Sequence, residues 1–421
     1  MATAPAPCSG STSTQGGTAA RPAAGSTGTE TRDPNSEPEL RDPNLSAEIE
    51  APEVDREEIR QLARQFAEAE LRPHVERWDH DGTFDPAVLE QLGELGFFGM
   101  LVPDAHGGLG FDLRTYVAAL EALAWGEPSV ALTLSIHSAF AVDLLVRHGT
   151  DQQKARWLPE LAAGSRVGCF ALSEADAGSD AAAVATTAER EGERWVLRGE
   201  KKWVTNGRIA GLAVVIARTA GEGAKGLSAF IVPTETAGWV VERREKTMGL
   251  RPIEVVTVRL DGIRLPGDAL LGTEGAGFRL AMEGLDLGRL GIAAQAVGIG
   301  QAALDHALGY AAERQQFGEP IRQFEAIQFM LADMATGVAA ARSLLERSAE
   351  ERSTRMSSMA KLFASEMAMR VATDAVQVYG GYGYMRDYPV EKLMRDAKAT
   401  EIYEGTNEIQ RVVIARELYR D

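Results

Sequence analysis

The sequence predicts an α+β protein, mainly α, in which an N-terminal helical domain, a middle β-barrel-like domain and a C-terminal four-helix bundle follow one another. Apolar residues recur every three or four positions near both ends of the chain, but they form short β-rich runs in between. The 421 residues also exceed what one hydrophobic core usually organises. We therefore expect domains at residues 49–163, 164–273 and 274–421, preceded by a disordered tail at 1–48.

The tail consists mainly of Ala, Thr, Ser, Gly and Pro and has almost no large apolar side chains. Such a composition cannot offset the entropy that ordering costs, which predicts disorder. Acidic residues such as Glu30 and Asp33 argue against a transit peptide, and the tail lacks the apolar stretch of a secretory signal.

Helical periodicity begins near Asp55 and predicts an all-α first domain. Ile59, Leu62 and Phe66 share one face of an expected helix. A second expected helix carries its apolar residues at Leu89, Leu92 and Leu95.

The middle domain is predicted from runs that are rich in β-branched and aromatic residues, at 195–197, 212–217 and 227–232. Val256, Val258 and Leu260 alternate as in a half-buried strand, and Asp261-Gly262 is expected to end that strand in a turn. These features predict a small sheet or barrel.

The last domain shows the clearest helical pattern. Seven residues are spaced three and four apart as in the seam of a helical bundle: Phe324, Ile327, Leu331, Met334, Val338, Ala341 and Leu345. A further expected helix carries a stripe at Met359, Phe363, Met367 and Val371, and Gly380-Gly381 is expected to end it.

Charge and cysteine usage exclude several classes of function. The formal net charge of −17 repels phosphate backbones, which disfavours nucleic acid as a partner. Two cysteines, Cys8 and Cys169, cannot form a disulfide framework and show no metal-ligand spacing. We expect a cytosolic protein without a metal site. Since the longest apolar runs look strand-sized, we also expect that it is not an integral membrane protein.

Three segments could carry chemistry, although each has a simpler interpretation. Phe170–Asp180 combines small and hydroxyl residues whose backbone N–H groups could approach a ligand, or it is an ordinary surface turn. Trp203 could cover a flat heterocycle with Thr205 bonding its edge, or it belongs to the core. Glu404-Gly405 could project a general base from a bend, or it is a solvated turn.

Taken together, six segments closely resemble the acyl-CoA dehydrogenase family in their order and approximate spacing. They are Phe170–Asp180, Trp203–Thr205, Asp286–Arg289, Glu313–Gly318, Gln377–Gly381 and Tyr403–Arg411. The resemblance covers about residues 50–421 and is closest to the short-chain, butyryl-CoA type. It implies three domains, helical, β-barrel-like and helical, as well as an FAD cofactor, an acyl-CoA substrate, electron transfer to an electron-transfer flavoprotein, and a homotetramer.

The resemblance also assigns residues to a cofactor site. Those that would line the flavin are Phe170, Leu172, Ser173, Gly178, Ser179, Trp203, Val204 and Thr205. Those that would reach the FAD of a neighbouring subunit are Arg314, Phe317, Gln377, Val378, Gly380 and Gly381, and Arg314 would counter the pyrophosphate charge. Thr406 and Glu408 would contact its adenine end or pyrophosphate.

The substrate is implied to lie near Ser179, Asp286, Arg289 and Gly405, with Glu404 as the catalytic base. Glu404 would remove the proton α to the thioester carbonyl while hydride leaves the β-carbon for flavin N5, which gives a trans-2-enoyl-CoA. The backbone N–H of Glu404 and a flavin ribityl hydroxyl would bind the thioester oxygen as an oxyanion hole does. Desolvation by the acyl chain would raise the pKa of Glu404.

One position separates the branches of the family. In the isovaleryl and long-chain branches the base occupies the position of Gly288, whereas here that position is Gly and the C-terminal position is Glu404. This pattern is that of the straight short-chain and medium-chain branch.

Two features depart from the family pattern. Pro252–Val255 replaces the small hydroxyl residues that usually follow the Gly-x-Arg motif. Glu325 replaces a Gln that usually contacts the neighbouring subunit's FAD.

Other functions on the same fold stay open from the sequence alone. An acyl-CoA oxidase or a desaturase of carrier-bound acyl chains would share these motifs. A non-catalytic or DNA-associated relative is disfavoured by the acidic charge and by Glu404, and a flavin monooxygenase normally lacks that carboxylate. The acyl chain length is also left open.

Overall fold

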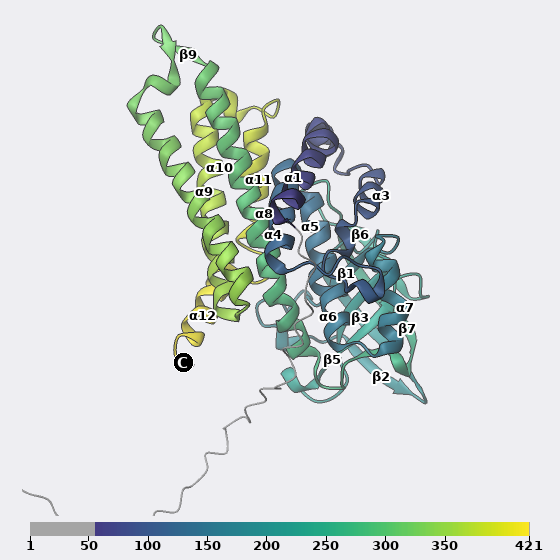
Figure 1. Cartoon of the computed structure of the whole chain (residues 1–421). Helices are drawn as coiled ribbons and strands as arrows, with labels where there is room; N and C mark the ends of the chain where they lie inside the picture. Colours follow the sequence, from purple (N-terminus) through teal and green to yellow (C-terminus); the bar gives the residue numbers. More distant parts are fainter. Residues whose placement is uncertain (1–54, 421) are drawn as a thin grey trace, which may run out of the picture. The chain divides into compact units, whose positions relative to one another are not determined.

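The computed structural model describes residues 55–420, so the predicted tail at 1–48 lies outside the described residues. Along the described chain, helices come first, strands follow and long helices end the sequence (Figure 1). This order confirms the predicted fold class.

The first helices are short, and several begin at side chains that accept a hydrogen bond from the first turn. They are α1 (Arg56–Phe66), α2 (Val75–Asp81), α3 (Ala87–Glu94), α4 (Leu113–Gly126), α5 (Pro128–Ile136), α6 (Asp143–His148) and α7 (Asp151–Ala162). The Asp112 carboxylate caps α4 by accepting from Thr115 N–H at 2.7 Å, and Thr150 with Gln153 forms a capping box at α7. Local chemistry therefore sets where these helices begin.

The predicted apolar faces of the first domain are only partly buried. Phe66 and Leu92 lie in the core, as expected, whereas Leu62 and Leu95 remain 36% and 40% exposed. Leu95 lies just beyond α3 as its C-cap residue, so it does not continue the apolar face of that helix.

Residues Pro128–His148 correct the expectation that no apolar run approaches membrane length. This stretch, which joins α5, a π-helical turn at His137–Val142 and α6, is long and apolar enough to cross a membrane by composition. However, 89% of its most apolar window is buried inside the protein, so its apolar character reflects a core position.

Eight strands form the middle sheet, in the order β6-β7-β3-β2-β4-β5-β8, with β1 paired to β4. Their bounds are β1 (Gly168–Ala171), β2 (Thr187–Glu191), β3 (Arg194–Thr205), β4 (Leu212–Arg218), β5 (Leu227–Pro233), β6 (Trp239–Arg244), β7 (Val255–Pro266) and β8 (Leu270–Leu271). Most pairs are antiparallel, and only β4 pairs in parallel, with β1 and β2. One face of the sheet packs around its own core, which includes Trp195, Phe230 and Val258.

The predicted turn at Asp261-Gly262 is wrong. Strand β7 continues through both residues, and the register with β3 shifts there because Gly262 adopts φ +67°. The glycine therefore forms a β-bulge, which needs the same left-handed backbone that a turn does.

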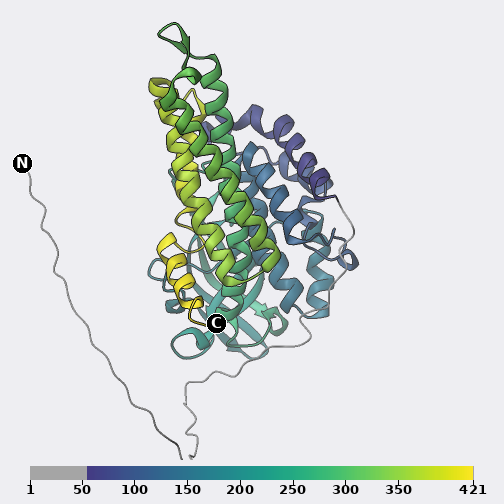
Figure 2. The same cartoon turned by 60° about the vertical axis from the view of Figure 1, so that its left-hand side comes forward.

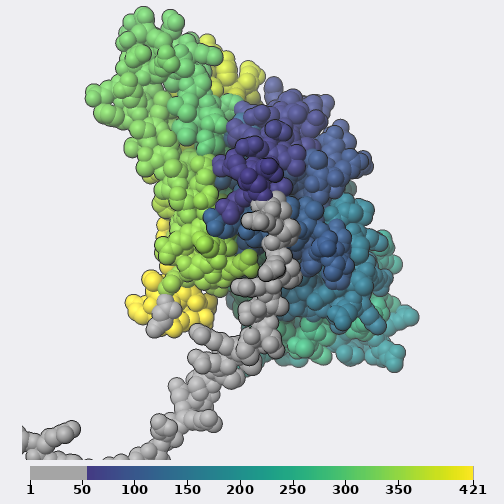
Figure 3. Space-filling model, in the orientation of Figure 1, coloured from purple at the N-terminus to yellow at the C-terminus, as the bar shows by residue number. Residues whose placement is uncertain are grey.

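Five helices follow the sheet. They are α8 (Gly277–Glu313), α9 (Glu325–Glu351), α10 (Thr354–Tyr379), α11 (Pro389–Thr400) and α12 (Asn407–Glu417). Figure 2 shows α8, α9 and α10 running side by side. A small hairpin, β9 (Gln315–Gln316) with β10 (Glu319–Pro320), joins α8 to α9 and projects from one end of these helices (Figures 1 and 3).

The predicted bundle seam is confirmed from Leu331 to Leu345, all five of its residues being buried, while Phe324 and Ile327 are partly buried. Helix α10 ends at Tyr379 with Gly380 as its cap, as predicted. The stripe on α10 is wrong at Phe363, which is 42% exposed. The buried face instead follows Ala360, Ala364, Met367, Val371 and Ala375, and Phe363 lies at its edge.

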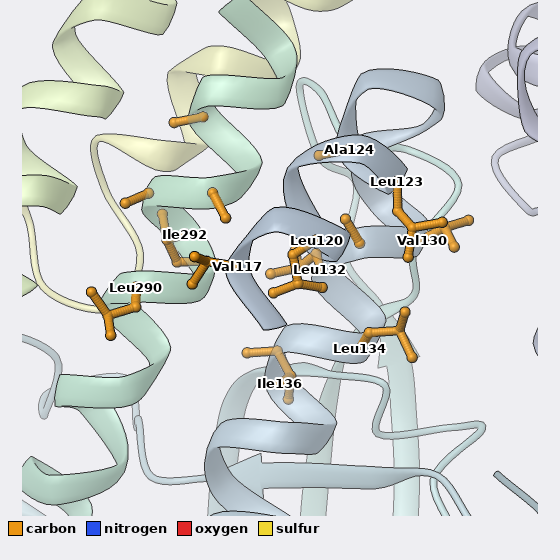
Figure 4. Packing of buried hydrophobic residues seen from close by; sticks show 14 of the residues in the cluster. Val117, Leu120, Leu123, Ala124, Val130, Leu132, Leu134, Ile136, Leu290 and Ile292 are labelled. Carbon is orange, nitrogen blue, oxygen red and sulfur yellow. The ribbon is translucent and has the colours of Figure 1, made fainter. Parts of the chain in front are cut away.

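The main core lies where the first helices meet α8. Figure 4 shows Val117 of α4 beside Ile292 of α8, with Leu120 and Leu132 packed further from α8 in the same core. Because α8 also packs against α10, this helix links the first domain to the C-terminal helices that carry Glu404.

Candidate active site

Glu404 lies on a tight turn between α11 and α12. Its φ is +53° and that of Gly405 is +90°, so two successive residues adopt the left-handed conformation. For Glu this conformation costs about 1–2 kcal/mol, and such strain tends to occur where the chain must aim a side chain. The turn is partly exposed, yet both Glu404 carboxylate oxygens are buried and make no hydrogen bond within the described residues.

Helix α8 makes room for this carboxylate at Gly288. A Cβ atom on Gly288 would lie 2.1 Å from Glu404 Oε2. On the same helix, a Cβ on Gly284 would meet Phe140 and a Cβ on Gly291 would meet Ser135. The glycines at positions 284, 288 and 291 therefore allow both Glu404 and the α5 region to approach α8 closely.

Burial raises the pKa of Glu404 to about 8, because removal from water disfavours the charged form of the carboxylate. The positive charges of Arg289 and Lys361 oppose this shift. Arg289 is itself buried, and its Nη1 donates to Asp286 at 2.5 Å. Asp286 also accepts from Thr354 Oγ1 at 2.6 Å, which ties α8 to the start of α10. The two predicted substrate residues thus form an ion pair close to the candidate base.

The segment predicted to line a flavin follows strand β1. Phe170 stacks on Phe140 with ring centroids 4.2 Å apart, and Leu172 is buried. Ser173 is half-buried, whereas Gly178 and Ser179 are exposed, and a Cβ on Gly178 would meet nothing within 4 Å. The backbone at Gly178 is therefore open to a ligand.

A buried ion pair between Lys201 and Glu174 holds the backbone of the segment that follows β1. Lys201 Nζ donates to Glu174 Oε1 at 2.7 Å and to the Leu172 carbonyl at 2.9 Å. The Glu174 carboxylate also accepts from the N–H groups of Ala185 and Thr186. Burial lowers the pKa of Lys201 to about 8, although Glu174 opposes the shift.

The Trp203 side chain projects away from the sheet where the pairing of β3 with β7 is irregular. Its φ is +56°, the register with β7 shifts beside it, and the side chain is 56% exposed. The alternative that Trp203 belongs to the core is therefore wrong. Its neighbour Val204 points into the sheet core, so only the backbone of Val204 can face a ligand, and Thr205 is half-buried.

A second group of predicted cofactor residues gathers at the other end of α10. A cavity of about 550 Å³ is lined by Arg314, Val378, Gly380 and Gly381, among others. Gln377 is exposed beside it, and Phe317, at the tip of the hairpin, is 96% exposed. This group lies about 27 Å along α10 from the residue that contacts Gly405.

Thr406 and Glu408 begin helix α12. The Thr406 hydroxyl accepts from Ile409 N–H at 3.4 Å as the helix N-cap, and Glu408 lies exposed in the first turn. Thr406 therefore caps α12, and contact of either residue with the adenine end of a cofactor stays a prediction.

The two departures from the family pattern lie in different surroundings. Pro252 and Ile253 are buried and belong to the protein interior. Glu325 is exposed in the first turn of α9, where a negative charge suits the helix dipole.

Several residues near Glu404 carried no signal that sequence reasoning used. The hydroxyl groups of Tyr116, Ser135 and Ser138 are buried, and within residues 55–420 they interact with one another but with no other polar group. The three side chains lie near one another, and the charge of Glu404 reaches Tyr116. Lys361 and Gln410, both fully buried, were missed as well because burial is unusual for these residue types.

The residues present fit a large planar cofactor. The Ser173 carbonyl accepts from Lys202 N–H at 2.9 Å, which places the half-buried Ser173 near the exposed indole of Trp203, and Gly178 follows with an open backbone. Arg314 and the open glycines 380 and 381 offer a cation and backbone to a phosphate group at the other end. Within residues 55–420, no cluster of three or more His, Cys, Asp or Glu could hold a metal ion.

Family models match most of the chain. The chain matches the acyl-CoA dehydrogenase N-terminal domain at residues 53–165, the middle domain at 169–263 and the C-terminal domain at 275–419. The chain therefore belongs to the acyl-CoA dehydrogenase family, whose members are FAD-dependent oxidoreductases of fatty acid metabolism.

Within the family, the chain is close to short-chain enzymes. The mitochondrial short-chain specific acyl-CoA dehydrogenase of Rattus norvegicus is 43% identical over 368 residues, which cover 86% of this chain and 89% of the relative. Butyryl-CoA dehydrogenase from Megasphaera elsdenii is 39% identical with a TM-score of 0.85, over 87% of this chain and 98% of that chain. A chain in a structure described as the electron transferring flavoprotein of Acidaminococcus fermentans is 42% identical with a TM-score of 0.86, over 87% of this chain and 98% of that chain.

Proposed function

We propose that this protein oxidises a short-chain acyl-CoA, such as butyryl-CoA, to the trans-2-enoyl-CoA, with Glu404 as the α-proton base. One observation carries the proposal. The Glu404 carboxylate is buried, has no hydrogen-bond partner within residues 55–420 and lies against the gap at Gly288. Burying a carboxylate without hydrogen-bond partners is unfavourable, so one that is kept in this state is suited to accept a proton from a ligand.

Burial supports the role of Glu404 as a base because it raises the pKa of this side chain to about 8. The α-carbon of a thioester is a much weaker acid than a solvated carboxylic acid. A raised pKa of Glu404 therefore reduces the pKa difference across which the proton must move. Arg289 and Lys361 limit the shift, which keeps a useful fraction of Glu404 ionised near neutral pH.

The backbone of the same turn can stabilise the charge that develops on the thioester oxygen. The N–H of Glu404 makes no hydrogen bond within the described residues and is available to donate. A donor fixed on the residue that removes the proton would lie close to the enolate-like oxygen as its charge forms. Bound FAD supplies the acceptor for the hydride that leaves the β-carbon.

The hydroxyls of Tyr116, Ser135 and Ser138 favour a short acyl chain. The three hydroxyls are buried and interact only with one another, and an alkyl chain packed against them supplies no further partner, which costs about 1–3 kcal/mol. A chain of about four carbons would extend less far among these groups than a medium-length chain.

We further propose that the site is completed by a second copy of the chain, as in a homotetramer. The candidate base and the Arg314 cavity lie near opposite ends of α10, about 27 Å apart, so each copy offers two half-sites. The electrons are proposed to pass to an electron-transfer flavoprotein, and the enzyme is proposed to act in the cytosol, which its two cysteines suit.

Steady-state kinetics over a chain-length series test these proposals. We expect the highest kcat/KM with butyryl-CoA when an electron-transfer flavoprotein is the acceptor, and negligible oxygen consumption without it. A clear optimum at eight carbons or longer would overturn the chain-length proposal. Rapid oxygen consumption would identify an oxidase instead. Sedimentation of a monomer that retains stoichiometric FAD would exclude the shared site.

A further inference from the structure

The two carbonyl groups that follow the Glu404 side chain are both held by buried side chains. Lys361 Nζ donates to the Gly405 carbonyl at 2.9 Å. Gln410 Nε2 donates to the same carbonyl at 2.9 Å and to the Glu404 carbonyl at 3.1 Å. Lys361 and Gln410 are both 0% exposed. We call these two side chains the carbonyl clamp.

The carbonyl clamp is itself anchored. Lys361 also donates to Asn407 Oδ1 at 2.9 Å, and that oxygen accepts from Ser365 Oγ at 3.1 Å. Since Lys361 and Ser365 lie one turn apart on α10, this long helix fixes the lysine side of the clamp. Gln410 lies in the first turn of α12, which fixes the other side.

The backbone at Glu404 needs to be held in place by its surroundings. Glu404 adopts φ +53°, which an ordinary residue leaves unless its surroundings hold it there. Fixing the two peptide groups after Glu404 determines where its Cα–Cβ bond points. The position of the carboxylate next to Gly288 then follows from the backbone, although no side chain within residues 55–420 bonds the carboxylate itself.

A lysine also supplies charge. Burying an amine is unfavourable, and burial lowers the pKa of Lys361 to about 7. Around Glu404, the charged or titratable groups are Arg289 on α8, Lys361 on α10, Tyr116 on α4 and the adjacent Tyr403. Of these, only the two cations favour the ionised base, so Lys361 both holds the turn and supports the charge of Glu404.

We propose that the carbonyl clamp positions Glu404 for proton abstraction, which makes Lys361 and Gln410 positioning residues for the reaction. This proposal rests on the proposed function. It predicts that loss of either side chain impairs the proton-transfer step more than it impairs substrate binding.

The test compares Lys361→Met and Gln410→Met with Lys398→Met, in which an exposed lysine of α11 that pairs with Glu401 is replaced in the same way. Each FAD-loaded protein is assayed with butyryl-CoA and with its α,α-dideuterated form. Binding of the product analogue crotonyl-CoA and thermal unfolding are measured alongside.

In the two clamp variants we expect kcat to fall by about 10- to 100-fold, as small misplacements of a reacting group do, while KM and the crotonyl-CoA Kd change by less than about threefold. The deuterium isotope effect on kcat should rise, because proton removal becomes slower. Lys398→Met should match the wild type in every readout.

Two results would overturn the proposal. A folded Lys361→Met protein with wild-type kcat would do so. An unchanged isotope effect, with activity falling only in proportion to lost FAD or lost thermal stability, would reduce the clamp to a structural role. If Lys361→Met does not fold, the same outcomes for Gln410→Met decide the matter. Failure of the proposed function looks different, because the wild type and Lys398→Met would then also fail to oxidise any acyl-CoA.

Discussion

Replacing Gly288 by Ala tests whether α8 and Glu404 meet as the structure shows. The added Cβ would lie 2.1 Å from Glu404 Oε2 and 2.7 Å from its Cδ, whereas ordinary contacts begin at 3.4 Å. The carboxylate, as the free end of a side chain, must therefore move by about 1 Å. A displacement of this size at a reacting group lowers the rate by up to about 100-fold.

Stability should change in the opposite direction. Gly in a helix interior is less stable than Ala by about 0.5–1 kcal/mol, so Gly288→Ala should keep or slightly raise the free energy of unfolding while kcat falls by about 10- to 100-fold. Gly309→Ala is the matched control, because Gly309 lies on the same helix and its Cβ would meet nothing within 4 Å. This control should gain similar stability and retain full activity.

The assay is steady-state oxidation of butyryl-CoA with urea unfolding measured in parallel. If Gly288→Ala retained wild-type kcat, the reasoning that Gly288 makes room for the catalytic carboxylate would be refuted. If both variants lost stability and activity together, a general defect of α8 would explain the result instead.

Four further predictions follow from charges in the structure. The value of kcat/KM, which reports the free enzyme, should rise with pH with a midpoint near 8, the pKa of Glu404, because only ionised Glu404 accepts the proton. A profile that is flat from pH 6 to 9 would contradict this assignment. The pKa of Glu404 in the folded protein lies above the 4.5 of an unfolded Glu, so folding takes up a proton between pH 4.5 and 8. The loss of stability caused by ionised Glu404 therefore grows as pH rises through this range. Glu404→Gln should have a higher urea midpoint than the wild type at pH 9 but not at pH 4. Arg314→Ala should lose FAD on gel filtration at high salt, whereas the exposed Arg322→Ala should retain it, and equal retention would remove Arg314 from the cofactor site. Lys201→Met should destabilise the protein by about 3–5 kcal/mol in urea unfolding because it leaves the buried Glu174 carboxylate without its counter-charge, and Lys201→Met/Glu174→Gln should recover part of that loss. A single variant as stable as the wild type would refute the role of the pair.

The order of elements could be predicted because it depends on local periodicity. The seam from Leu331 to Leu345 repeats over several turns, so the burial of one face is visible in the sequence. The end of α10 could be predicted because Gly380 supplies the conformation that a helix cap needs. The order helix, sheet, helix follows from these patterns without any tertiary knowledge.

Features that depend on tertiary neighbours could not be predicted. Asp261-Gly262 has the composition of a turn, and only the pairing of β7 with β3 shows that it is a bulge. Leu62 and Phe363 lie on apolar faces, but their exposure depends on how far a neighbouring element extends. Pro128–His148 is apolar because other helices surround it.

The candidate site was predictable in part, through motifs rather than through geometry. The resemblance pointed to Glu404 and to the side-chain-free position at Gly288, and the structure adds that the Glu404 carboxylate occupies the space that a Cβ at Gly288 would need. Lys361 could not have been found in this way, because a lysine in a helix is usually solvated. Its role depends on a backbone carbonyl that lies 44 residues further along the chain.

The most direct test of the account is an anaerobic titration of the purified FAD protein with butyryl-CoA, in which the visible absorbance of the oxidised flavin is followed for the wild type and Glu404→Gln. We expect bleaching of the wild type and none of the variant, because the base that removes the α-proton is lost. A variant that bleaches as fast as the wild type, or a wild type that no acyl-CoA bleaches, would contradict the claim that Glu404 initiates acyl-CoA oxidation.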